Sequence, residues 1–251
     1  VNVHAPIDSY DKHRFYLFDI EIRAYNEGVA FCYHFPEQSN GLFLNVTGER
    51  TQFTLPKGTS AFFENWAQGP YSKILLSDWP KRMESERPLV LLLPNGLHVA
   101  LMEARMVDYA RGKFKKLSNS NTLQIALYDG VEVMSPYHTP WRVIMVGDKA
   151  VDLINHKQLM LNLNDPNVLD DTSWIRPGKA FRCSKLDWKS ILQSIHFAEQ
   201  QRMQYIELDA GWYGPEQFVS SSALKIGPNR DFNIPELCDS AHRHGLGVFL
   251  Y

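Results

Sequence analysis

The chain has 251 residues, of which 44% are hydrophobic, 22% charged and 12% aromatic, enough apolar material for the core of one large domain or two ordinary ones. A formal net charge of −2 gives no electrostatic reason to expect a nucleic acid or an anionic membrane as a partner. No apolar run approaches the roughly 18 residues that a membrane span needs, so we expect none.

From Arg14 to about Asn164 the sequence predicts short strands separated by turn residues. Phe15–Arg23 is rich in β-forming residues, Asn26–Gly28 predicts a turn, and Val29–Phe35 predicts the strand that follows. Further strands are expected at residues 42–46, 52–55, 89–93, 98–102, 123–127 and 141–146. Short strands punctuated by Gly, Pro and Asn are typical of an antiparallel β-sandwich. No helix is predicted in this part of the chain.

The pattern changes after a polar stretch at residues 170–178, which suits a linker between domains. Strands are predicted at 179–183, 205–209 and 246–251, and two amphipathic helices between them. Ser184–Asp187 fits a capping box at the start of the first helix, and Asn233–Glu236 repeats that pattern at the second. Gly245 suits the position just beyond the end of the second helix.

Strands that alternate with helices indicate parallel pairing through right-handed crossovers. A closed (β/α)8 TIM barrel needs roughly 250 residues, far more than the chain holds from Gly178 onward. We therefore expect a fragment of a longer protein: residues 1–170 form part of an antiparallel N-terminal β-sandwich, and residues 171–251 form the first part of a (β/α)8 barrel. A complete three-stranded α/β sheet is the alternative, although its last strand would be an apolar edge.

The three cysteines, Cys32, Cys183 and Cys238, are far apart in the sequence and odd in number. They form neither a metal-ligand spacing nor a disulfide framework. We expect them to be buried free thiols.

The end of the second predicted barrel strand carries the residues best suited to binding a sugar. In such barrels the reacting groups stand at the carboxyl ends of the strands, and Asp209 is at that position. Its carboxylate can accept two sugar hydroxyls, Trp212 offers a flat apolar face to a pyranose ring, and Gly211 and Gly214 permit a tight turn. The alternative is that Asp209 caps a turn and Trp212 only packs. The connection from Ala210 to Phe232 is unusually long, which favours a site.

Several segments, in the right order, resemble glycoside hydrolase family 97. They are Glu27–Phe31, Thr139–Arg142, Gly147–Asp148, Asp152–Ile154, Leu161–Asn164 and the domain junction Thr172–Lys179. The resemblance implies an N-terminal β-sandwich, a catalytic (β/α)8 barrel and a small C-terminal β domain. It also implies hydrolysis of terminal α-glycosidic bonds in oligosaccharides by an α-glucosidase or α-galactosidase.

The resemblance further implies a calcium ion near the sugar, reached by a glutamate of the sandwich. The matching residue is Glu103; a solvated strand end is the alternative, and a calcium ion needs six to eight oxygen ligands in any case. The segment after the first barrel strand lacks the tryptophans of many family members, and Arg182 is expected to take part of that substrate-binding surface. The catalytic carboxylates are expected beyond this chain, which leaves retention or inversion open.

Two other functions remain open from the sequence. One is an α-galactosidase of the melibiase type, whose second barrel strand ends in a similar Asp-Gly-Trp sequence; the long preceding sandwich speaks against it. The other is a sugar-binding module without catalysis, if the chain is complete. Residues 1–4 show no signal peptide, and a periplasmic or secreted location is implied by the family resemblance alone.

Overall fold

The computed structural model describes residues 2–6, 15–37, 43–215, 218–223 and 233–251, with backbone alone for residues 2–6 and 15–17. The chain divides into two compact units, Val1–Asn167 and Val168–Tyr251. The division falls three residues before the predicted boundary at residue 170. Parts of the long connection predicted between Ala210 and Phe232 lie outside the described residues.

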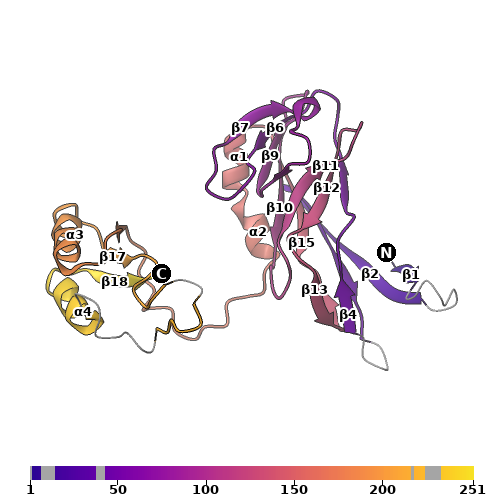
Figure 1. The fold of residues 1–251 in the computed structure, drawn as a ribbon. Helices are drawn as coiled ribbons and strands as arrows, with labels where there is room; N and C mark the ends of the chain where they lie inside the picture. The colour runs from indigo at the N-terminus through magenta and orange to yellow at the C-terminus, as the bar shows by residue number, and fades with distance from the viewer. Residues whose placement is uncertain (1, 7–14, 38–42, 216–217, 224–232) are drawn as a thin grey trace. The chain divides into compact units, whose positions relative to one another are not determined.

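The first unit is built mainly from antiparallel strands (Figure 1). Among the described residues, its largest sheet has nine strands, in the order β1-β2-β3-β15-β10-β9-β6-β7, with β14 also paired to β3. These strands are β1 (Asn2–Pro6), β2 (Phe15–Tyr25), β3 (Gly28–Phe35), β6 (Ser60–Phe63), β7 (Ser72–Leu75), β9 (Leu89–Leu92), β10 (His98–Ala104), β14 (Tyr137–His138) and β15 (Trp141–Gly147).

The other described strands of this unit form two smaller antiparallel sheets. One has the order β5-β12-β11-β8 and consists of β5 (Gln52–Thr54), β12 (Thr122–Leu127), β11 (Gly112–Lys116) and β8 (Glu84–Ser85). The other pairs β13 (Val131–Met134) with β4 (Phe43–Val46). A short 3-10 turn, η1, spans Leu76–Asp78. Layers of antiparallel sheet agree with the predicted sandwich.

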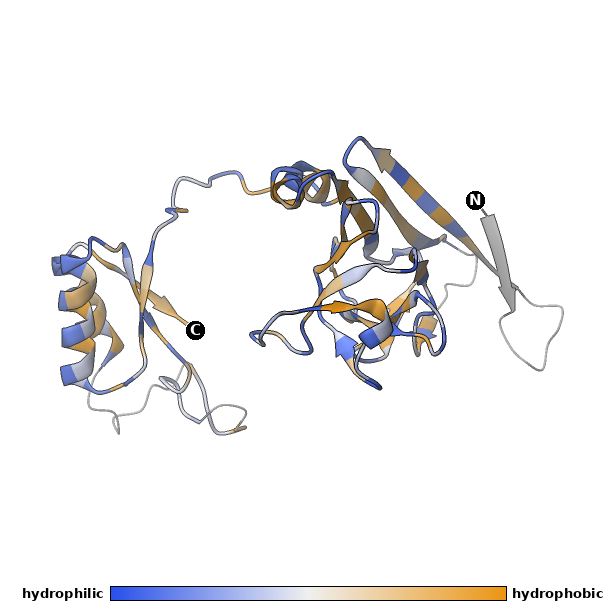
Figure 2. Ribbon diagram, turned by 90° about the horizontal axis from the view of Figure 1, so that it is seen from above, coloured by the Kyte–Doolittle hydropathy of each residue, from blue (hydrophilic) through white to orange (hydrophobic). Residues whose placement is uncertain are grey.

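Alternation of side chains explains how these strands make a core. In β13 and β9, buried residues alternate with more exposed ones, because successive side chains point to opposite faces. Figure 2 shows hydrophilic and hydrophobic residues alternating along β2 as bands of colour. The largest cluster joins Phe53, Phe114, Leu123 and Ile125 of the small sheet to Leu89, Leu91 and Leu101 of the large one.

The prediction of no helix in this unit is wrong. Two helices, α1 (Ala150–Asn155) and α2 (Lys157–Asn162), follow β15. The Asp152 carboxylate accepts a hydrogen bond from the Lys149 backbone N–H (2.8 Å), which satisfies a donor at the start of α1. Leu159 and Leu163 are buried against the large sheet. Each helix has only six residues, too few for an amphipathic period to stand out in the sequence.

The second unit alternates strands and helices, as predicted. Its strands β16 (Ala180–Cys183), β17 (Tyr205–Leu208) and β18 (Gly247–Leu250) are parallel and lie in that order. Helices α3 (Trp188–Gln200) and α4 (Ile234–Arg243) connect them. Ile191, Ile195, Leu237 and Ala241 of the helices pack with Ile206 and Leu208 of the sheet. Figure 2 shows the hydrophobic side of α3 turned towards the strands.

The helix ends confirm one capping prediction and correct the other. The Asn233 side chain accepts a hydrogen bond from the Glu236 backbone N–H (2.7 Å), as the sequence predicted for α4. Gly245 follows the C-cap His244 with a φ of 71°, which suits glycine. For α3 the N-cap is Asp187, whose carboxylate accepts from the Ser190 N–H (2.9 Å), and not Ser184. The N-cap lies three residues after Ser184 because the Asp187 carboxylate can accept hydrogen bonds from the free backbone N–H groups of the first turn.

The cysteines are free, as predicted. Cys32 and Cys183 are buried, whereas Cys238 is only half-buried. Burial, followed by the charge of Glu21, raises the pKa of the Cys32 thiol to about 12, so this thiol stays protonated at neutral pH. In the described part of the chain, no helix is both long enough and apolar enough to cross a membrane.

Candidate functional site

Asp209 lies immediately after β17, at the carboxyl end of the parallel sheet. Its Oδ2 atom forms an ion pair with Nη2 of Arg182 on the neighbouring strand β16. The hydrogen bond from Arg182, with a second from the Ala210 backbone N–H, lowers the pKa of the Asp209 carboxyl. Asp209 is therefore a carboxylate at neutral pH and is protonated only below the usual range of an aspartic acid. The structure thus brings together two of the three predicted substrate-binding residues.

These two residues belong to the face of the sheet that the helices do not cover. Arg182, Glu207 and Phe249 are register partners across the three strands, so their side chains share one face. Asp209 follows Glu207 by two residues and points to that face as well. The opposite face carries Cys183, Ile206 and Leu208, which pack against α3 and α4. Phe249 is 59% exposed, and the Arg182 side chain is 65% exposed.

The turn after Asp209 has the predicted glycine geometry. Gly211 and Gly214 have φ values of 93° and 126°, and residues with a Cβ atom rarely adopt such values. A Cβ on Gly214 would also lie 2.5 Å from Oγ of Ser221. Glycine is therefore required at Gly214 by both conformation and space.

Trp212 is packed into the core of the second unit. Only 8% of its surface is exposed. Its indole N–H donates to the backbone oxygen of Tyr251 (2.7 Å), and its ring meets that of Tyr213 edge to face. The structure thus shows Trp212 in a packing role, and its contact with a sugar stays a prediction.

Glu103, the predicted calcium ligand, lies within an ion-pair network. Its side chain is 2% exposed, which excludes a solvated strand end. One carboxylate oxygen pairs with Nη1 of Arg142 and the other with Nε of Arg87. The backbone N–H of Gly112 donates to the same carboxylate (3.0 Å to Oε1). With both oxygens held by cations, these surroundings do not fit a calcium site, because binding would require a guanidinium group to withdraw.

Arg142 is the centre of this network and is completely buried. It bridges Glu103, its register partner across β10 and β15, and Glu49, to which Nε donates at 2.9 Å and Nη2 donates as well. Burial alone would lower the pKa of Arg142, but the hydrogen bond and charge of Glu49 and the charge of Glu103 outweigh it and raise that pKa. A permanently charged guanidinium thus joins two carboxylates inside the sandwich.

A third buried carboxylate, Glu86, extends the network. Glu86 is 5% exposed and contacts Arg87, Arg111 and Lys113 at 3.4, 3.2 and 3.0 Å. Arg87 touches both Glu86 and Glu103, so the two groups are continuous. Buried charges are tolerated only when they are paired and hydrogen-bonded in this way.

Sequence reasoning missed the roles of Arg142 and Glu49. Arg142 belongs to the Thr139–Arg142 segment that resembles the family, but no sequence spacing connects it to Glu49 or Arg87. The contacts depend on which strands pair, and the alternation of β15 does not reveal a charge in the core because Trp141, Arg142 and Val143 are all buried.

Two other groups have the composition and spacing of metal ligands within the described residues: Glu21, His34 and His138 in the first unit, and His196, Glu199 and His244 in the second. In each, the ligand atoms lie within 4.8 Å of one another. Neither group contains Glu103 or Asp209.

Curated relatives cover nearly the whole chain. A probable retaining alpha-galactosidase of Streptomyces bingchenggensis is 28% identical over 246 residues, which is 92% of this chain and 37% of the relative. A retaining alpha-galactosidase of Bacteroides thetaiotaomicron is 25% identical over 93% of this chain and 42% of the relative. The chain therefore spans about two fifths of the length of these relatives.

A solved structure of a family 97 enzyme also matches nearly the whole chain. A glycoside hydrolase family 97 enzyme from Pseudoalteromonas sp. strain K8, solved in complex with acarbose, superposes with a TM-score of 0.76 and is 25% identical. The match covers 93% of this chain and 39% of that one. Residues 4–166 match the family described as Glycosyl-hydrolase 97 N-terminal, which is most of the chain. The chain belongs to glycoside hydrolase family 97.

Proposed function

We propose that this chain is part of an enzyme that hydrolyses terminal α-glycosidic bonds in oligosaccharides. The observation that carries the proposal is the carboxylate of Asp209, held ionised by Arg182 at the carboxyl end of a parallel sheet. The family membership supports it. No residue of this chain is assigned to the catalytic pair.

The second unit is proposed to be the first part of a (β/α)8 barrel. Its three parallel strands with connecting helices are the repeating unit of that fold. The face opposite the helices carries Arg182, Glu207 and Phe249, and it is the face that becomes the interior when such a sheet closes. In this arrangement Asp209 stands at the mouth of the barrel, where α/β-barrel enzymes bind their substrates.

Within that site we assign Asp209 and Arg182 to sugar binding. Arg182 and the Ala210 backbone N–H fix the Asp209 side chain, and a carboxylate has further lone pairs that can accept a sugar hydroxyl. The exposed guanidinium of Arg182 offers further donors to the hydroxyl oxygens of the sugar. Trp212 is proposed to shape the turn from beneath, since its ring is packed in the core.

The proposed reaction is hydrolysis of an α-galactoside with retention of configuration at the anomeric carbon. Both curated relatives described above are named retaining alpha-galactosidases, although one of them is called probable. Retention requires two carboxyl groups about 5 Å apart, one acting as nucleophile and one as acid and base. Membership of family 97 favours this reading over the melibiase-type alternative.

Calcium dependence and export from the cytoplasm remain predictions from the family resemblance. Calcium is tested by adding a chelator to the full-length protein and restoring the ion. Export is tested by locating the full-length protein in cell fractions. Glu103 is the candidate ligand from the sequence, and its ion pairs with Arg87 and Arg142 are the observation that speaks for a structural role.

The activity is tested on the full-length protein that carries this chain. We expect turnover of 4-nitrophenyl α-galactoside, with the 4-nitrophenyl α-glucoside as the comparison, and NMR of the first product should show the α-anomer. Asp209→Asn should lose most activity, whereas Asp187→Asn, at a helix cap in the same unit, should keep it. Activity on neither glycoside, or unchanged kinetics for Asp209→Asn, would disprove the corresponding part of the proposal.

A further inference from the structure

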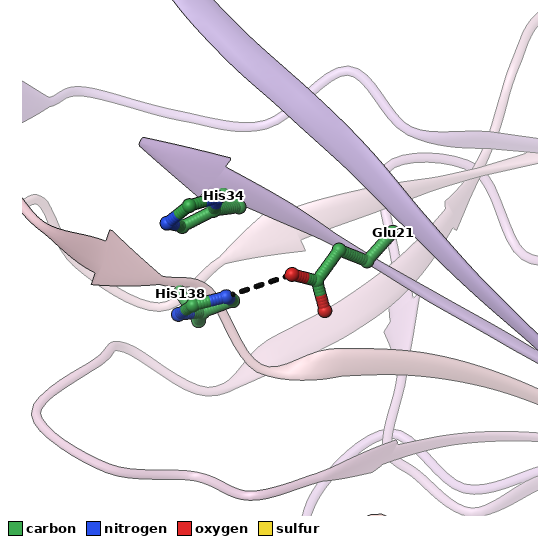
Figure 3. A group of neighbouring side chains, drawn as sticks. All are labelled: Glu21, His34 and His138. Carbon is green, nitrogen blue, oxygen red and sulfur yellow. Dashed lines mark hydrogen bonds and ion pairs between the residues drawn. The ribbon is translucent and has the colours of Figure 1, made fainter. Parts of the chain in front are cut away.

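Two histidines and two carboxylates of the first unit meet on one face of the large sheet. His34 of β3 is the register partner of both Asp19 of β2 and His138 of β14. Glu21 follows Asp19 by two residues and points to the same face. Pairing of three strands thus brings together side chains from distant parts of the sequence, as Figure 3 shows for Glu21, His34 and His138.

The contacts in this cluster are close and directional. Nε2 of His138 lies 3.0 Å from Oε1 of Glu21, and Nδ1 of His34 lies 3.3 Å from Oδ2 of Asp19. The two imidazole rings stack with centroids 4.0 Å apart and an angle of 13° between their planes. Potential ligand atoms of Glu21, His34 and His138 all lie within 4.8 Å of one another.

We propose that Glu21, His34 and His138 bind a divalent transition-metal ion of the zinc type. Two imidazole nitrogens and one carboxylate oxygen form a ligand set that zinc accepts, with a fourth position left for water. The ion would take the place of the direct contact between Oε1 of Glu21 and Nε2 of His138. Calcium is disfavoured because it prefers six to eight oxygen ligands.

Asp19 has the position of a supporting carboxylate. A metal-binding histidine usually gives its second ring N–H to a carboxylate, which fixes the tautomer and the ring orientation. Asp19 contacts Nδ1 of His34, so Nε2 of His34 is left for the metal. Asp19 is therefore a positioning residue and not a ligand.

The site is accessible but not fully exposed. The side chains of His34, His138 and Glu21 are 22%, 37% and 39% exposed. A cleft of about 150 Å³ borders Glu21 and His138 and is also lined by Arg23, Arg105, Trp141 and Asp165. A hydrated ion can enter from this side, and binding joins β2, β3 and β14 at one point. Binding of the ion therefore stabilises this part of the sandwich.

The experiment uses the metal-free full-length protein without a histidine tag, titrated with ZnCl2 or CaCl2 at neutral pH. Isothermal titration calorimetry and metal analysis after dialysis should show zinc bound at this site, and zinc should raise the Tm, because a ligand of the folded state stabilises it. Calcium should give no binding that depends on Glu21, His34 or His138. Protons compete for imidazole, so zinc affinity should fall as the pH is lowered.

Variants distinguish this site from other zinc ligands. His138→Gln and Glu21→Gln should each abolish this binding, and Asp19→Asn should weaken it about 10- to 100-fold. The matched control is His196→Gln, in the more exposed cluster of the second unit. This variant should leave zinc binding at Glu21, His34 and His138 unchanged. Circular dichroism and glycosidase activity of each variant show that it is folded. Absence of zinc binding, or zinc binding that survives His138→Gln and Glu21→Gln in folded protein, would overturn the proposal.

Discussion

Each unit contains a guanidinium paired with a carboxylate, and the two pairs differ in almost everything else. Arg142 and Glu103 are 0% and 2% exposed, whereas Arg182 and Asp209 are 65% and 24% exposed. Every oxygen of Glu103 is held by a cation, but only one oxygen of Asp209 is.

The difference separates a structural charge from one that can bind a ligand. A buried pair stabilises only as long as both members are present, because an unpaired charge in the core is costly. An exposed pair contributes little to stability, since water screens it. The groups of an exposed pair can, however, release their bound water and bind a substrate instead. Each of the following experiments tests this contrast.

The largest effect is expected for Arg142→Ala. Removing the guanidinium takes the shared cation from the buried Glu49 and Glu103, of which Glu103 keeps Arg87. This loss should lower the free energy of unfolding by about 3–5 kcal/mol. Denaturant unfolding of the full-length protein, followed by circular dichroism, measures the change. Arg182→Ala is the matched control and should leave the unfolding midpoint unchanged. Equal stability of the two variants would contradict the contrast between the pairs.

Asp209→Asn should reduce kcat/KM on the glycoside substrate on the order of a hundredfold, because charge-assisted hydrogen bonds to the sugar are lost in the transition state. The thermal midpoint should not move, since the proposed place of Asp209 is the mouth of the barrel, where water screens its charge. Steady-state kinetics and thermal unfolding on the same preparation check both statements. Rescue of Asp209→Ala by azide would show instead that Asp209 is the nucleophile.

Glu103→Gln keeps the shape of the side chain but removes its charge, so Arg87 and Arg142 lose a counter-ion. We expect the free energy of unfolding to fall by about 1–3 kcal/mol. Calcium titration of the same variant tests whether Glu103 is a calcium ligand. Calcium affinity that is lost in Glu103→Gln but kept in Arg87→Gln would establish Glu103 as a metal ligand. Unchanged affinity in both would leave it a structural residue.

The smallest effect is a shift of pH dependence in Arg182→Ala. The hydrogen bond and charge of Arg182 lower the pKa of Asp209, so without them that pKa moves up towards the ordinary value. The carboxylate form is then lost at a higher pH, and the acidic limb of the kcat/KM profile should move upward. A profile measured from acid to neutral pH checks this. A limb that does not move would show that Asp209 titrates independently of Arg182.

The sequence determined much of the backbone because the relevant signals are local. Short runs of β-forming residues separated by turn residues predicted eight of the strands found in the first unit, including β2, β3, β10 and β15. Asn233 and the glycines after Asp209 predicted a helix start and a tight turn, since their side chains, or the lack of one, act on neighbouring backbone atoms. The position of Asp209 at a strand end was also predictable from its own segment.

Tertiary structure decided what surrounds each side chain. Trp212 could have been an open platform or a core residue, and its packing in the second unit decided for the core. Glu103 could have been a solvated strand end, but the pairing of β10 with β15 placed it beside Arg142. His34 and His138 meet only because β14 pairs with β3. Burial and charge pairing depend on contacts between distant segments, and no single segment of the sequence carries that information.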